Sequence, residues 1–104
     1  MAAKLVWLPK ALTDVHDTYV QIGLDNPAAA ERFFDRFEQK AQLLAGQPRM
    51  GVRRPEISAT TRMLVEAPFV ILYETIPDDD EAPVETIQIV RVIDGRRDLE
   101  KLPI

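Results

Sequence analysis

The sequence predicts an α+β fold: an N-terminal strand, an antiparallel two-helix hairpin, then a three-stranded antiparallel meander that forms one sheet packed on the helices. Three observations support it. Residues 9–46 carry apolar side chains at helical spacing, residues 61–93 hold three short runs rich in β-formers, and only short breaks separate those runs. Because 104 residues suit one domain, we expect residues 1–104 to share a single core.

The chain opens with a short strand and a first helix. Residues 3–8, AKLVWL, form a run too brief for a helix and end at Pro9, so they predict a strand. Pro9 suits the first position of a helix, where its missing N–H has no partner to lose. We expect this helix to end near Gly23. Its apolar positions recur at spacings of three and four, at Leu12, Val15, Tyr19 and Ile22.

The second helix follows almost at once and has clear end signals. Asn26 is a suitable N-cap, Pro27 suits the first turn, and Gly46 with Pro48 behind it predicts the stop. Its apolar positions again follow the helical period, at Ala30, Phe33, Phe34, Phe37, Ala41 and Leu44. Since only two or three residues separate the helices, we expect an antiparallel helical hairpin whose apolar stripes need a partner surface.

The second half of the chain predicts a loop and three strands. Residues 47–57 contain two prolines and a glycine and indicate a loop. The strand-like runs are 61–67, 69–76 and 84–93; short breaks between them favour an antiparallel meander. The last run is nearly continuous in β-branched residues, so we expect it to be central in the sheet. The tail after it is expected to add a helical turn.

Composition excludes several classes of function. The formal net charge is −4 and the pI is near 4.9, which argues against direct nucleic-acid binding because such proteins usually carry excess Lys and Arg. The chain has no cysteine, so disulfides and thiolate metal sites are excluded. Its apolar runs are too short for a membrane span and its start lacks a signal-peptide layout. We expect a cytoplasmic protein without cofactors or a membrane partner.

Six arginines form the most informative set of candidate site residues. They lie in or beside the loop and strands of the second half: Arg53, Arg54, Arg62, Arg91, Arg96 and Arg97. Arginine is suited to bidentate contacts at interfaces, and antiparallel pairing can bring several of these side chains to one rim of the sheet. The alternative is ordinary ion pairing, of Arg96 or Arg97 with Asp94 or Asp98, and of Arg62 with Glu74.

Other candidate residues have simpler readings. His16 lies beside the apolar stripe of the first helix, and no serine or cysteine motif accompanies it, so a helix-border histidine is favoured over catalysis. The acidic residues 78–81 lack the alternating ligands and glycine of a calcium loop and indicate a solvated hairpin tip. Phe33, Phe34 and Phe37 suit either the core or a groove for an amphipathic partner helix, and the sequence does not separate the two.

Four segments are notable for their order and spacing along nearly the whole chain: LDNPAAAERFFDRF, LLAGQPRMGVRRPEI, TRMLVEAPFVILYE and IVRVIDGRRDLEKL. Together they resemble the ParE branch of the RelE/ParE toxin superfamily. The resemblance implies the toxin of a bacterial type II toxin–antitoxin pair, a ParD-like antitoxin that binds and blocks it, and DNA gyrase as the target. It implies the same fold as that predicted above.

Two further functions remain open beside gyrase inhibition. RelE-like relatives cut mRNA on the ribosome, but RNA cleavage needs a general base and acid, which arginine cannot supply at neutral pH. Tyr73 and Glu74 are adjacent on a strand and point to opposite faces, so they do not form a simple pair. Asp94 stands where many ParE-like chains have His, which motivates the second alternative, an inactive relic that only binds antitoxin.

For the antitoxin we expect an amphipathic helix or extended arm. It would lie on apolar surface of the hairpin or sheet and pair through its own acidic or apolar residues. A binding-type inhibitor needs only a rigid surface with arginine anchors, since arginine is enriched at interface hot spots. The sequence therefore predicts a non-enzymatic inhibitor in which the six arginines face the target or the antitoxin.

Overall fold

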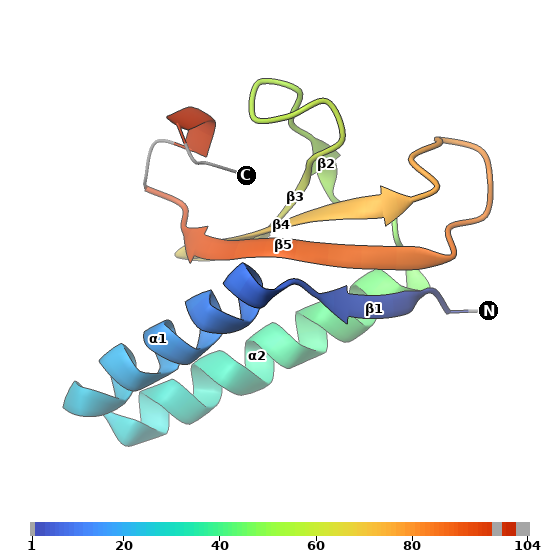
Figure 1. Cartoon of the computed structure of the whole chain (residues 1–104). Helices are drawn as coiled ribbons and strands as arrows, with labels where there is room; N and C mark the ends of the chain where they lie inside the picture. Colours follow the sequence, from blue (N-terminus) through green and yellow to red (C-terminus); the bar gives the residue numbers. More distant parts are fainter. Residues whose placement is uncertain (1, 97–98, 102–104) are drawn as a thin grey trace.

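A computed structural model describes residues 2–96 and 99–101 and shows two helices beneath one face of a five-stranded sheet (Figure 1). The predicted α+β class is confirmed. The elements in chain order are β1 (Lys4–Trp7), α1 (Pro9–Asp25), α2 (Pro27–Gly46), β2 (Val52–Arg53), β3 (Arg62–Glu66), β4 (Phe69–Ile76), β5 (Thr86–Asp94) and the 3-10 turn η1 (Leu99–Lys101).

The helical hairpin turns at a single residue, Asn26. Its backbone N–H bonds to the carbonyl of Ile22 at the end of α1, and its side-chain oxygen accepts a hydrogen bond of 3.1 Å from the N–H of Ala29 in α2. The expected N-cap is confirmed, but the expected end of α1 near Gly23 is two residues early. Gly23 lies inside the helix, where a Cβ would meet Ala30 at 3.6 Å.

The predicted antiparallel meander is confirmed as β3, β4 and β5, but the sheet as a whole is mixed and has five strands, because β1 and β2 add to it. Its strand order is β1-β5-β4-β3-β2, and β1 runs parallel to β5 with Lys4 opposite Thr86. The helical hairpin carries the chain from β1 at one edge of the sheet to β2 at the other, and β3, β4 and β5 then return across the sheet until β5 lies beside β1. As expected, β5 is an interior strand. β2, which was predicted as loop, pairs antiparallel with β3; two residues are too few to give a strand pattern.

Apolar residues form a core on each face of the sheet. The larger core joins Phe37, Leu44, Ile71, Ile87 and Val92 between the helices and the sheet. The smaller one covers the other face. It joins Val70, Leu72, Ile93 and Leu99, with Ile57 and Met63 packed against them. The turn η1 supplies Leu99 to the smaller core, so the expected helical turn in the tail is confirmed by residues 99–101.

Tyr73 fastens the segment after α2 to the middle of the sheet. Its fully buried hydroxyl donates to the carbonyl of Pro48 and accepts from the N–H of Gly51, both at 2.9 Å. Burial raises the pKa of Tyr73. A Cβ at Gly51 would lie 2.5 Å from that hydroxyl and 2.9 Å from the carbonyl of Met63, so this close approach requires glycine.

Candidate functional site

An apolar groove runs along the helical hairpin and reaches the edge strand β1. Its volume is about 600 Å³. Trp7 and Phe37 form its floor, with ring centroids 5.2 Å apart, while Tyr19 and Phe34 meet edge to face at 6.1 Å near its mouth. Leu12 is 55% exposed and Phe34 is 40% exposed. Large apolar side chains left in water around a hollow are typical of a surface that a partner covers.

The structure separates the three phenylalanines that the sequence left ambiguous. Phe33 and Phe37 are buried in the core, and Phe37 also forms the floor of the groove, whereas Phe34 is exposed in the groove. Both interpretations of this cluster are therefore present.

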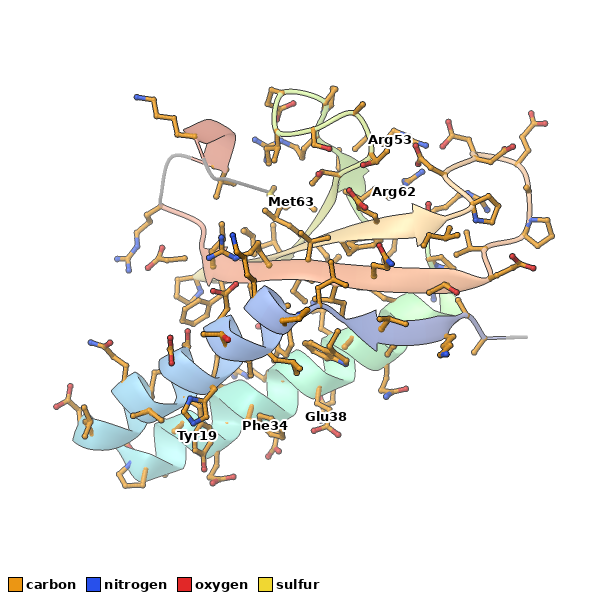
Figure 2. The ribbon with its side chains drawn as sticks, in the orientation of Figure 1. Tyr19, Phe34, Glu38, Arg53, Arg62 and Met63 are labelled. Carbon is orange, nitrogen blue, oxygen red and sulfur yellow. The ribbon has the colours of Figure 1, made fainter. Side chains whose placement is uncertain are left out.

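The polar residues at the groove include Tyr19, His16 and two acids, Glu31 and Glu38. The hydroxyl of Tyr19 on α1 donates a hydrogen bond to Glu31 on α2, and this bond raises the pKa of Tyr19. His16 is exposed and lies 3.5 Å from Asp17, consistent with a helix-border position. Figure 2 shows Tyr19, Phe34 and Glu38 in a row along the hairpin, on the side away from the sheet.

Two of the predicted arginines, Arg53 and Arg62, meet at Asp80 in the loop between β4 and β5. Arg62 Nη2 lies 2.9 Å and Arg53 Nη2 3.0 Å from the same carboxylate oxygen of Asp80. Arg53 also pairs with Asp78 at 3.0 Å. The guanidinium of Arg62 is buried, and its Nε has no hydrogen-bond partner among the described residues. Figure 2 shows this pair near the loop, well apart from the groove.

The acidic loop is folded onto these arginines rather than being simply a solvated tip. Arg49 donates to the backbone carbonyls of Asp79 and Ala82, which holds the loop against the segment after α2. The carboxylate of Asp79 accepts the N–H groups of Glu81 and Ala82, which lowers the pKa of Asp79. Two basic segments therefore fix the position of this loop.

The remaining predicted arginines lie elsewhere, so the set does not converge on one rim. Arg54 forms an ion pair with Glu56, and its Nη1 donates a hydrogen bond of 3.1 Å to the sulfur of Met63. Arg96 pairs with Asp94 at 2.5 Å, one of the ion pairs considered above. The other, Arg62 with Glu74, is replaced by the contact with Asp80, and Glu74 accepts a hydrogen bond from Thr60 instead. Arg97 lies outside the described residues.

Arg91 is bound to α1 of the hairpin instead of lying at the rim. Its Nε and Nη2 donate to the two oxygens of Asp14 in α1 at 2.7 and 3.0 Å, and the N–H of Val92 donates to the same carboxylate at 2.9 Å. These hydrogen bonds raise the pKa of Arg91. β1 ends at Trp7, opposite Ile89, so no β1 residue lies beside Val92, and Asp14 accepts the Val92 N–H instead.

Sequence reasoning missed the acids that organise these sites. Asp14 and Asp80 lie far in sequence from the arginines they bind, so no local pattern marks them. Glu31 and Glu38 could have been found from the sequence, because their spacing from Phe34 places all three residues on one face of a helix. Among residues 2–96 and 99–101, no cluster of three metal-binding side chains occurs and no helix is long and apolar enough to cross a membrane.

The pairing of Asp80 predicts a pH effect. The hydrogen bond from Arg53 is the main cause that lowers the pKa of Asp80 below its usual range. A carboxylate whose pKa is lowered by folding stabilises the fold above its unfolded pKa and loses that contribution as pH falls through the folded value. In thermal melts from pH 6 down to pH 2, the melting temperature should therefore fall less for Asp80→Asn than for the unchanged chain. An equal fall in melting temperature for both proteins would contradict the pairing.

Comparison with known proteins agrees with this architecture. A family model described as "ParE toxin of type II toxin-antitoxin system, parDE" matches residues 5–99. A solved structure, "Chromosomal ParDE TA system from P. aeruginosa", is similar with a TM-score of 0.69 and 22% identity, over 89% of this chain and 96% of that one. The curated proteins give no significant match. Since the family model spans nearly the whole fold, the chain belongs to the ParE toxin family of type II toxin–antitoxin systems.

Proposed function

We propose that this chain inhibits DNA gyrase by binding it in the cytoplasm, and that a ParD-like antitoxin neutralises the chain by direct contact. The family match over residues 5–99 carries this proposal. The proposed activity is binding rather than catalysis, in keeping with the geometry of the strands. Tyr73 is buried and engaged with Pro48 and Gly51, and Glu74 is engaged with Thr60, so neither is a free general acid or base.

The apolar groove of the hairpin is the proposed seat of the antitoxin. It combines a concave floor of Trp7 and Phe37 with exposed Leu12 and Phe34 at its sides. An amphipathic helix lays its apolar face into a groove of this kind, with anchors one turn apart. Covering these side chains removes apolar area from water, which supplies the main driving force for association. The toxin alone is therefore expected to be less soluble than its complex.

The six predicted arginines are the proposed contact residues for the target, with the antitoxin as an alternative partner. Arg53, Arg54 and Arg96 keep part of their side chains in solvent and have N–H groups to offer. Arg62 and Arg91 are largely buried, so in this proposal they hold the surface in shape. Arg97 completes the proposed set from the sequence. The loop with Asp78 and Asp80 lies beside Arg53 and is part of the same surface.

A supercoiling assay with purified gyrase tests the proposal. The chain is expected to inhibit supercoiling, and combined Arg53→Ala, Arg54→Ala and Arg96→Ala changes are expected to weaken inhibition at least tenfold without unfolding the protein. Inhibition that survives these changes would remove the arginines from the account. Cleavage of mRNA in a purified translation system with gyrase unaffected would favour the nuclease, and absence of growth arrest in cells lacking antitoxin would favour the relic.

A further inference from the structure

The helix α2 presents opposite charges on its two solvent-facing sides. Glu31, Asp35 and Glu38 recur at spacings of four and three and therefore share one side of the helix. Glu31 and Glu38 line the apolar groove, and Asp35 lies with Glu38 in the adjoining shallow hollow. We call these three residues the acidic stripe.

Basic residues occupy the other side of the helix, away from the groove. Arg32 and Arg36 line a small pocket beside Pro68 and Phe69 at the turn between β3 and β4. The next residue of this row, Lys40, lies 3.7 Å from Glu66 of β3. No Lys or Arg is among the described residues that line the groove. The helix therefore keeps its positive charge at the sheet and its negative charge beside the groove.

The acidic stripe has no cationic partner within the described part of the chain. The hydroxyl of Tyr19 donates a hydrogen bond to Glu31, which holds the carboxylate at the groove and leaves its charge uncompensated. Glu38 and Asp35 make no ion pair with the described residues. Like charges one turn apart on a helix are mildly unfavourable for the isolated helix, so this arrangement does not serve the stability of α2 itself.

From this arrangement we propose that the segment occupying the groove is an amphipathic helix with Lys or Arg residues along the edge that faces the acidic stripe. The inference rests on the proposed function and specifies the chemistry of the antitoxin: apolar anchors toward Trp7 and Phe34, bases toward Glu31 and Glu38. It differs from the sequence-based expectation of an antitoxin paired through acidic or apolar residues in giving the antitoxin a basic edge. An acidic edge would face like charge here, which costs affinity.

Charge reversal at the stripe tests this inference. The Glu31→Lys/Glu38→Lys variant and the unchanged chain would be titrated by calorimetry with the purified ParD-like antitoxin encoded beside the toxin, at 50 and 300 mM salt. We expect about a tenfold or larger loss of affinity at low salt, because two attractive contacts become repulsive. We also expect the salt dependence to shrink, because the stripe no longer attracts the bases.

A matched control separates the stripe from net charge. Asp17→Lys/Asp25→Lys changes the formal charge by the same amount at two exposed positions of α1 that do not line the groove. Its affinity is expected to stay within about threefold of the unchanged chain. If the lysine variant of the stripe misfolds by circular dichroism, Glu31→Gln/Glu38→Gln takes its place, with a smaller expected loss of about threefold.

The outcomes distinguish this inference from the proposed function. Tight antitoxin binding that is insensitive to the Glu31 and Glu38 changes, or equally weakened in the control, overturns the basic-edge inference and leaves the toxin–antitoxin pairing intact. Failure of the unchanged chain to bind the antitoxin overturns both. Restored binding when the antitoxin's Lys and Arg residues are changed to Glu against the Glu31→Lys/Glu38→Lys toxin supports the inference directly.

Discussion

Replacing Asp14 with alanine is expected to lower the free energy of unfolding by about 3 kcal/mol, because it leaves a largely buried guanidinium without its counterion. The side chains of Asp14 and Arg91 are only 15% and 13% exposed. The change also removes the acceptor of the Val92 N–H. A domain of this size has a total stability of about 5–15 kcal/mol, so the loss is a large fraction of it.

Urea unfolding at neutral pH measures this effect, and two variants on α1 calibrate it. Asp14→Asn retains an oxygen that can accept the Val92 N–H but loses the charge. Its decrease in unfolding free energy is therefore expected to be smaller than the decrease for Asp14→Ala. Asp17→Ala removes an exposed carboxylate of the same helix and is expected to change stability by less than about 0.5 kcal/mol. If Asp14→Ala lowered the free energy of unfolding no more than Asp17→Ala does, the ion pair between α1 and β5 would not contribute to stability.

Replacing Phe37 with alanine is expected to cost about 3–5 kcal/mol, the second large effect. The ring is 1% exposed and lies between Trp7 and Phe33, with centroids at 5.2 and 6.2 Å. Removing it loses the transfer free energy of a buried aromatic side chain and leaves a cavity beneath the groove that neighbouring elements fill only in part. Chemical denaturation measures this loss of unfolding free energy. The dependence of that free energy on denaturant concentration should stay unchanged if the variant retains the folded state.

Phe34→Ala is the matched comparison one turn away on the groove side. Because Phe34 is 40% exposed, its removal is expected to change stability by less than about 1 kcal/mol. It should instead weaken antitoxin binding, since this ring lines the proposed seat. Equal destabilisation by Phe34→Ala and Phe37→Ala would contradict the division of the aromatic cluster into core and groove.

Much of the local structure was predictable because its signals lie within a few residues. Pro9 begins α1, and Asn26 with Pro27 begins α2, as their capping chemistry requires. The β-branched run of β5 identified an interior strand. The end of α1 was misjudged because Gly23 lies inside the helix, which continues to Asp25.

The site was less predictable because it depends on distant pairs. The sequence identified the arginines as notable, but it could not assign Arg91 to Asp14, 77 positions away, or Arg62 to Asp80 rather than Glu74. Likewise, a helical period cannot tell which phenylalanine faces the sheet and which faces an open groove. The register of α2 against the sheet sets that orientation.

Short-range chemistry in the amino-acid sequence accounts for the helices, their caps, the three long strands and the family to which the chain belongs. The folded arrangement alone accounts for the parallel pairing of β1 with β5, the two-residue strand β2, the partners of the arginines and the acid-lined groove. The physical reason is range: caps and periodicities act over one or two turns, whereas strand pairing, ion pairing and burial join residues that meet only when the chain has packed.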